Sequence, residues 1–334
     1  MKNVIQISES NWHLFLREIS HEMNVFVPVK EGVHIEYQLY NHENRQPVYN
    51  QPLPTSPLKL FFLPVRENVV ISKNNPRKNL IIGAPACDIE GLRLLDEIYL
   101  DDRYPDLKYR EKRDNTILIG TDCHEIRENC HCTTYGIDPY PVENVDATLV
   151  SLNGEMIITV RTSKGKELIN RYGKNFPLSE PAKNLLEQAD ARRSSTREQL
   201  KHQNSSLPDY AATGVLVNKS GDEIWMKYAR TCVSCGACAT ICSTCTCFLL
   251  IDRPGFEKVR QMDACQYPGF ERIAAGEDPL HKRHLRFKNR YLCKYVWKSE
   301  KFKSQACTGC GRCIDCCIGD INKNRIFMEM LESS

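Results

Sequence analysis

The chain is 334 residues long, with 41% hydrophobic and 26% charged residues, a composition typical of a folded protein with about two domains. Its formal net charge of +3 is too small to indicate nucleic acid or a membrane surface as a partner. Charged residues interrupt the first 22 residues, so these lack the apolar segment of a signal peptide, and no stretch reaches the roughly 20 apolar residues of a membrane helix. We therefore expect a cytoplasmic protein without a membrane span.

The N-terminal part alternates predicted strands and helices. An apolar run at 79–84, a segment with helical periodicity at 89–100 and a second apolar run at 116–120 predict a strand, a helix and a strand. This order is typical of a parallel α/β sheet. The other elements predicted before this unit are a helix over 11–19 capped by Ser10 and strands over 25–29, 33–39, 60–65 and 69–72.

Two features separate this part from the rest of the chain. Asn153 and Gly154 stand between apolar runs at 147–152 and 155–160, which is a strong signal for a β-hairpin. A polar helical segment at 178–204 follows, and its charge density is typical of a connector between domains. We place the boundary near residue 221.

Cysteine is the unusual residue, because the chain contains seventeen. In a reducing cytoplasm such thiols indicate metal binding or redox chemistry more often than disulfides. Eight of them form two copies of the spacing C-x2-C-x2-C-x3-C, each with glycine after the second cysteine. The first copy is Cys232, Cys235, Cys238 and Cys242, and the second copy is Cys307, Cys310, Cys313 and Cys317.

This doubled spacing is typical of ferredoxins with two 4Fe-4S clusters, in which the fourth cysteine of each copy ligates the other cluster. Zinc is the alternative, but four zinc ligands usually come as two separated pairs. We therefore expect an α+β protein, with an α/β N-terminal domain at 1–221 that contains the β-hairpin and a helical dicluster ferredoxin-like domain at 222–334. The predicted ligand sets are a first site of Cys232, Cys235, Cys238 and Cys317 and a second site of Cys307, Cys310, Cys313 and Cys242.

Four further cysteines predict a third site in the N-terminal domain. Cys87 and Cys123 each follow a predicted strand, and Cys130 and Cys132 come a few residues later. If the two strands are parallel neighbours, they lie roughly 4.8 Å apart and both thiols open at the same edge of the sheet. The four thiols could then hold a third 4Fe-4S cluster, with burial as small apolar residues as the alternative. The cysteines that stay open between further ligands and packing residues are Cys245, Cys247 and Cys265.

These residues resemble the family of iron-sulfur electron-transfer subunits found in anaerobic sulfite reductase and, as the beta subunit, in sulfhydrogenase. The sequence departs from that family where Ser243 and Ile318 replace a proline, and where Cys293 replaces a histidine before Lys294 and so becomes another candidate ligand. The motifs that carry the resemblance extend over most of the chain. They are Ala86-Cys87-Asp88-Ile89 with Leu95-Asp96, Glu128-Asn129-Cys130-His131-Cys132, 232–247 ending in Thr244-Cys245-Thr246-Cys247, Cys265 with Pro268-Gly269-Phe270, and 307–317.

The resemblance implies a role in passing electrons from a flavin-containing, NAD(P)H-linked reductase subunit to a catalytic subunit, either a sulfite reductase or a hydrogenase. The sequence agrees with a chain that has no substrate chemistry of its own, because no strand is followed by a glycine-rich nucleotide-binding turn and no catalytic motif is found. The alternative of another class is a stand-alone iron-sulfur redox sensor.

A basic stretch at 281–303 contains nine Lys or Arg residues and a single acidic residue, Glu300. Such a stretch could dock an acidic partner protein, or it could balance the negative charge of the clusters. Nucleic acid binding is disfavoured, because the charge of the whole chain is small.

Overall fold

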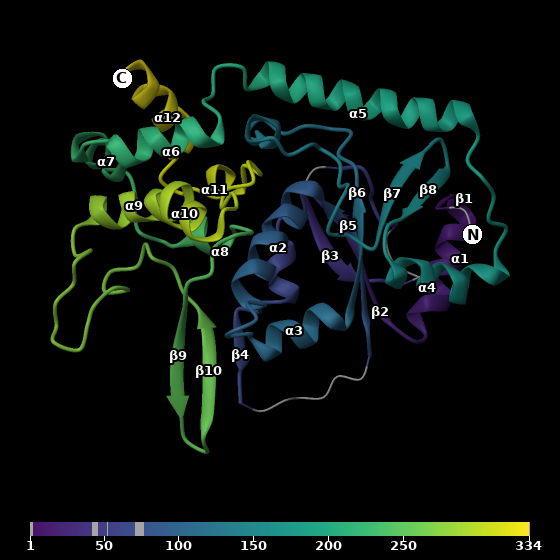
Figure 1. Ribbon diagram of the computed structural model, residues 1–334, viewed down its shortest axis with the longest axis horizontal. Coiled ribbons are helices and arrows are strands. Elements are labelled where there is room, and N and C mark those ends of the chain that lie inside the picture. The colour runs from purple at the N-terminus through teal and green to yellow at the C-terminus, as the bar shows by residue number, and fades with distance from the viewer. Residues whose placement is uncertain (1–2, 42–45, 52, 71–76, 334) are drawn as a thin grey trace.

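The computed structural model describes residues 3–41, 46–51, 53–70 and 77–333. Its N-terminal half is built on a seven-stranded sheet with the order β1-β8-β7-β6-β5-β2-β3 (Figure 1). Strands β2, β5, β6 and β7 run parallel to one another, whereas β3 pairs antiparallel with β2 and β8 pairs antiparallel with β7 and β1. The strands are β1 (Val4–Ser8), β2 (Asn24–Glu31), β3 (His34–Leu39), β5 (Asn79–Pro85), β6 (Thr116–Thr121), β7 (Ala147–Leu152) and β8 (Glu155–Val160).

Helices cover both faces of this sheet, as expected for parallel strands that are buried on both sides. On one face, α1 (Glu9–Ser20) and α4 (Ser163–Tyr172) pack with alternate strand residues into a core that includes Trp12 and Phe15. On the other face, α2 (Ala86–Tyr99), α3 (Leu107–Asp114) and the short helix η1 (Leu58–Phe61) form a second core. The N-terminal half is therefore a three-layer α/β unit.

The long helix α5 (Lys183–Gln203) leads from the sheet to a mainly helical C-terminal part (Figure 1). Aromatic residues dominate the core of this part, among them Trp225, Tyr291 and Phe327. A small sheet of order β4-β10-β9 projects from it, formed by β4 (Arg66–Asn68), β9 (Phe248–Arg253) and β10 (Glu257–Met262). The helices are α6 (Tyr210–Lys219), α7 (Asp222–Ala229), α8 (Ala237–Thr240), α9 (Arg283–Leu292), the π-helical turn η4 (Cys293–Trp297), α10 (Lys298–Phe302), α11 (Arg312–Asp315) and α12 (Lys323–Glu332).

The predicted fold class is confirmed, and so is the strand-helix-strand unit. Strands β5 and β6 are parallel neighbours, joined through α2 and α3. The hairpin at Asn153 and Gly154 is also present, and both residues have the positive φ that its turn requires.

Three local predictions were wrong. The strand expected at 60–65 is the 3₁₀ helix η1 followed by a loop, because Leu58, Phe62 and Leu63 face the core from one side of a turn. Instead of a strand at 69–72, β4 ends at Asn68, and residues 71 and 72 lie outside the described residues. Helix α1 begins at Glu9 because Ser8, not Ser10, accepts the capping hydrogen bond from the Asn11 amide.

The expected boundary near residue 221 stays a prediction. Helix α6 precedes that residue, yet Tyr210 and Val217 belong to the C-terminal core. Strand β4 also pairs with β10 across the boundary. The two halves thus share elements on both sides.

Candidate iron-sulfur sites

The two four-cysteine motifs have the same local structure. In each, a glycine in the left-handed conformation, Gly236 with φ of 73° and Gly311 with φ of 80°, begins a helix of four residues, α8 or α11. The third cysteine of each motif, Cys238 or Cys313, lies on that helix, and the fourth follows its end. Because α8 and α11 lie against each other, the motifs face one another.

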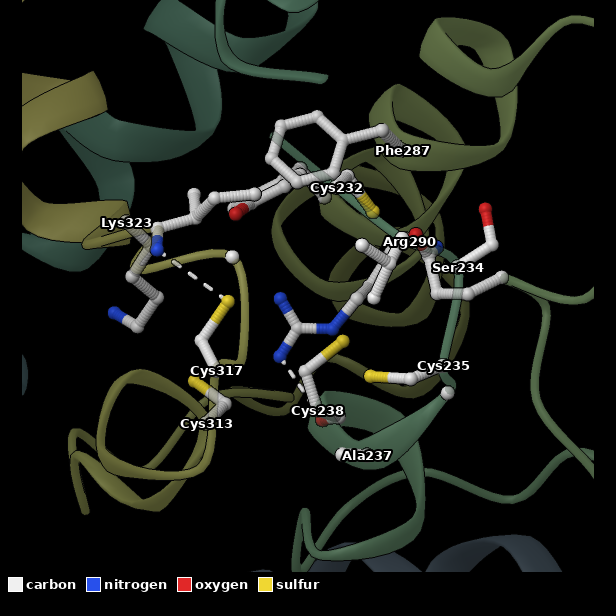
Figure 2. Close-up of a pocket in the computed structure, with 16 residues that line it drawn as sticks. Cys232, Ser234, Cys235, Ala237, Cys238, Phe287, Arg290, Cys313, Cys317 and Lys323 are labelled. Carbon is white, nitrogen blue, oxygen red and sulfur yellow. Dashed lines mark hydrogen bonds between the residues drawn. The ribbon is translucent and has the colours of Figure 1, made fainter. Parts of the chain in front are cut away.

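The first predicted site is assembled from both motifs. Cys232, Cys235 and Cys238 line one cavity together with Cys317 of the second motif, as Figure 2 shows. Cys313 lines the same cavity. The thiols that line this cavity include the crossed set that the spacing predicts for the first site, and which of them bind one cluster stays a prediction.

Two cations also line this cavity, Arg290 and Lys323. The Arg290 side chain is 4% exposed, and Nη2 donates to the Cys238 carbonyl oxygen at 3.2 Å. Its Nε has no hydrogen-bond partner among the described residues, and Figure 2 shows the guanidinium pointing among the thiols. A buried cation with an unmet donor is costly unless an anion lies beside it, so the cavity fits a thiolate-bound, negatively charged cluster.

At the second predicted site, Cys242 and Cys307 are both buried and are joined through Lys294. The Lys294 ammonium donates to Cys242 Sγ at 2.9 Å and to the carbonyl oxygen of Ala306, the residue before Cys307, at 3.1 Å. Burial alone would raise the pKa of Cys307, but Lys323 and Lys294 lower it below its ordinary value. The thiolate form that iron requires is therefore favoured for Cys307.

The four cysteines of the third predicted site line one cavity, together with Cys310 of the second motif. Cys87 lies in the first turn of α2, directly after β5, and Cys123 follows β6. Burial raises the pKa of the Cys87 and Cys123 thiols well above the ordinary value. These thiols are neutral until a metal displaces their protons.

The loop that carries Cys130 and Cys132 is held in place from two sides. From α5 and its end, Gln203 Nε2 and Asn204 Nδ2 donate to the Cys130 carbonyl oxygen at 3.0 and 2.8 Å. From the second motif, the Gly309 carbonyl accepts from the His131 amide at 2.8 Å. The third site therefore packs directly against the second motif.

A buried ion pair joins the second and third predicted sites, and no sequence pattern assigned it. Asp88 and Arg312 are 1% and 2% exposed, and the Arg312 nitrogens Nη1 and Nη2 contact the Asp88 carboxylate at 2.5 and 2.7 Å. The Ser243 hydroxyl also donates to Asp88, at 2.5 Å. Asp88 follows Cys87, Ser243 follows Cys242 and Arg312 precedes Cys313, so the pair fixes these two sites relative to each other. The one sequence feature that could have indicated this pair is Asp88, which stands in the motif at 86–89 that carries the family resemblance.

Of the cysteines left open, Cys245 lies beside Cys242 of the second predicted site. Cys245 shares a hydrogen bond with Cys242, and this bond is the main reason why the pKa of Cys242 lies well below its ordinary value. A hydrogen bond from Cys265 lowers the pKa of Cys247 to about 6. Cys293 is half-buried at the start of η4. Whether any of them binds iron stays open.

Among the described residues, no three Cys, His, Asp or Glu side chains lie close enough together to bind one metal ion. The thiolates of a 4Fe-4S cluster bind different irons, so they lie farther apart than the ligands of one zinc ion. The cavities lined by four or five thiols suit the larger group.

Part of the basic stretch at 281–303 is buried and does not form a surface patch. Arg286, Arg290 and Lys294 follow each other at four-residue spacing and are all buried, at 6%, 4% and 3% exposure. Arg290 lines the first cavity with cysteines of both motifs, and Lys294 donates to Cys242, whereas Arg286 donates to backbone carbonyl oxygens. The placement of Arg290 and Lys294 supports charge balance for the clusters, whereas the outer lysines remain available to a partner.

Comparison with known proteins agrees with this geometry. Residues 231–321 match the family model of a 4Fe-4S dicluster domain. The whole chain is similar to sulfhydrogenase 2 subunit beta of Pyrococcus furiosus, with 26% identity over 331 residues that cover 95% of each chain. Across the described residues, no helix is both long and apolar enough to cross a membrane. The chain is thus an iron-sulfur protein related to the sulfhydrogenase beta subunit, as its sequence motifs indicate.

Proposed function

We propose that this chain is an electron-transfer subunit of an oxidoreductase complex and holds three 4Fe-4S clusters in a row. One observation supports the proposal: two cysteines predicted for the second site lie at the cavities of the other two sites. Cys310 lines the cavity of the third site, and Cys313 lines the cavity of the first. A row of adjacent redox centres is what electron transfer through a protein requires, and a 4Fe-4S cluster supplies acceptance and release of one electron.

The residues of this chain would bind the three clusters, bury them and balance their negative charge. Thiolates from Cys87 to Cys317 would supply the ligands, in the three sets predicted from the sequence. Buried cations, Arg290 beside the first site and Lys294 beside the second, would offset the negative charge of the thiolate-bound groups. The Asp88–Arg312 pair would keep the second and third sites at a fixed separation.

The first site is the end of the row that faces a partner. Cys235 is the one exposed cysteine among the described residues, and its neighbour Val233 is 62% exposed. Ile318, next to Cys317, is 73% exposed. Apolar side chains around a solvent-facing redox centre suit a protein partner.

Partner subunits are proposed from the relative. A sulfhydrogenase beta subunit is by name one part of a larger enzyme, so a hydrogenase-type catalytic subunit is favoured here, with a sulfite reductase as the second candidate. A flavin-containing, NAD(P)H-linked subunit would supply or receive electrons at the other end. A cytoplasmic location remains part of the proposal.

Anaerobic purification of the tagged chain from its own cell tests this function. We expect about twelve irons per chain if all three sites are loaded, about eight if only the doubled motif is, and co-purification with a flavoprotein and a catalytic subunit. Dithionite should bleach the absorbance of the isolated chain, and NADH or NADPH alone should not. Stoichiometric zinc, or oxidation of NADH by the chain alone, would overturn the proposal, and a chain that never co-purifies would favour the sensor.

A further inference from the structure

Helix α9, the π-helical turn η4 and the first residue of α10 carry four cations at regular spacing, and two of them, Arg290 and Lys294, lie beside cysteines. Arg286, Arg290, Lys294 and Lys298 are spaced by four residues, which places them on one side of a helix. Each of the first three is buried. A π-helical turn widens the helix at Lys294, and such turns are frequent at functional sites.

Lys294 is bonded as an ammonium group. Its three donors match three acceptors: Cys242 Sγ at 2.9 Å, Thr244 Oγ1 at 2.8 Å and the Ala306 carbonyl oxygen at 3.1 Å. No carboxylate pairs with Lys294 in the described part of the chain. A buried ammonium without a carboxylate needs another negative charge, and the sulfur of Cys242 is the group it reaches.

The corresponding cysteine of the first site has a different environment. Cys317 Sγ accepts a hydrogen bond from the backbone amide of Ile321 at 3.3 Å. That donor is neutral, whereas the donor to Cys242 carries a full charge. The two fourth cysteines of equal spacing thus differ by one buried positive charge at hydrogen-bond distance.

We propose that Lys294 raises the reduction potential of the second site by placing a positive charge at hydrogen-bond distance from Cys242, so that this site holds an electron more readily than it would beside a neutral donor. Adding an electron makes a thiolate-bound cluster more negative, and a cation at hydrogen-bond distance stabilises that state. Lys298 acts in the same direction from farther away, since it donates to the Thr244 carbonyl oxygen at 2.7 Å and to Thr246 Oγ1 at 3.0 Å. The inference rests on the proposed function only in requiring a cluster at the second site.

The alternative is a purely structural role, because Lys294 also joins the two motifs through Thr244 and Ala306. The charge distinguishes the two roles. Lys294→Arg keeps the charge but changes the shape, whereas Lys294→Met removes the charge and keeps most of the length. A structural bond would be weakened by both, whereas the potential would fall only in the second.

The test is an anaerobic redox titration of the purified, iron-loaded chain followed by electron paramagnetic resonance, with no partner and no activity assay. In Lys294→Met we expect the ratio of reduced to oxidised cluster at fixed potential to fall at least tenfold for one signal, which is 59 mV for a one-electron couple. That signal should be the one altered by Cys310→Ser. Lys294→Arg should shift it less than threefold. Lys288→Met, on the same helix but paired with Asp222, should leave every signal unchanged.

An unchanged ratio in loaded Lys294→Met, or an equal fall in Lys294→Arg, would overturn the inference. If Lys294→Met does not load the second site, Lys298→Met decides instead: a smaller fall in the same signal supports the inference, and no change overturns it. A wild-type chain without any signal that depends on Cys310 would instead refute the cluster assignment, so failure of the proposed function is read separately.

Discussion

The two four-cysteine motifs have equal spacing and equal local structure, yet their surroundings differ. The first motif lies near the surface, with Cys235 exposed and Cys232 and Cys238 half-buried. In the second motif Cys307 is buried, Cys310, Cys313 and Cys317 are half-buried, and the loop packs on the loop of the third site. In the proposed row, it is this difference in position, not the motif itself, that would leave the first site to exchange electrons with a partner and place the second site in the middle.

Among the changes that test this comparison, the largest effect is expected from replacing Asp88. Asp88→Ala leaves the buried Arg312 without its partner, which costs about 3–5 kcal/mol for pairs of this kind. Because Arg312 belongs to the second motif, the second and third sites should fail before the first. The measurement is the guanidinium concentration at which cluster absorbance is lost.

Glu187→Ala is the matched control, since Glu187 forms an exposed pair with Lys183 one helical turn away on α5. Such pairs contribute roughly 0.3–0.5 kcal/mol. If Asp88→Ala shifts the midpoint no more than this control does, the buried pair does not hold the sites together.

The next largest effect concerns the third site. A double change of Cys123 and Cys130 to Ser should remove one cluster, lowering iron from about twelve to about eight per chain, while the signals of the other two remain. Unchanged iron in the double variant would return Cys123 and Cys130 to a packing role.

A smaller effect tests the crossed ligation. In Cys317→Ser, the perturbed signal should be that of the first site, although Cys317 belongs to the second motif, because its thiol lines the cavity of Cys232, Cys235 and Cys238. Comparison with the spectrum of Cys232→Ser identifies the signal. If Cys317→Ser instead alters the signal that Cys310→Ser alters, each motif binds its own cluster with its own four cysteines, and the predicted ligand sets are wrong.

How much of this could be predicted from the sequence depends on the range of the interaction. Spacing along the chain predicted the two motifs and, through the strand-helix-strand unit, the meeting of Cys87 with Cys123. The Asp88–Arg312 pair joins residues 224 positions apart, so no local pattern contained it. The basic stretch at 281–303 was visible as charge, but its burial depends on tertiary packing, and only the four-residue spacing of Arg286, Arg290 and Lys294 could have indicated one inward face.

The smallest predicted effect compares the two motifs at their equivalent glycines, Gly236 and Gly311. Both have positive φ, so alanine at either position carries a backbone cost of roughly 1–2 kcal/mol. A Cβ at Gly236 would lie 2.6 Å from Cε1 of the Tyr267 ring, which is 37% exposed and can turn away. A Cβ at Gly311 would lie 2.6 Å from the Asn129 carbonyl oxygen, which is backbone beside the third site and cannot.

Gly311→Ala should therefore destabilise the chain by about 1–3 kcal/mol more than Gly236→Ala, the cost of forcing an extra carbon into a packed interior. It should also displace the loop of Cys130, so the signal of the third site should broaden in Gly311→Ala and remain sharp in Gly236→Ala. Thermal loss of absorbance gives the first quantity, and low-temperature paramagnetic spectra give the second. Equal losses at both glycines would mean that the second motif is no more tightly constrained than the first, and the assignment of the second motif to the middle of the row would lose its structural support.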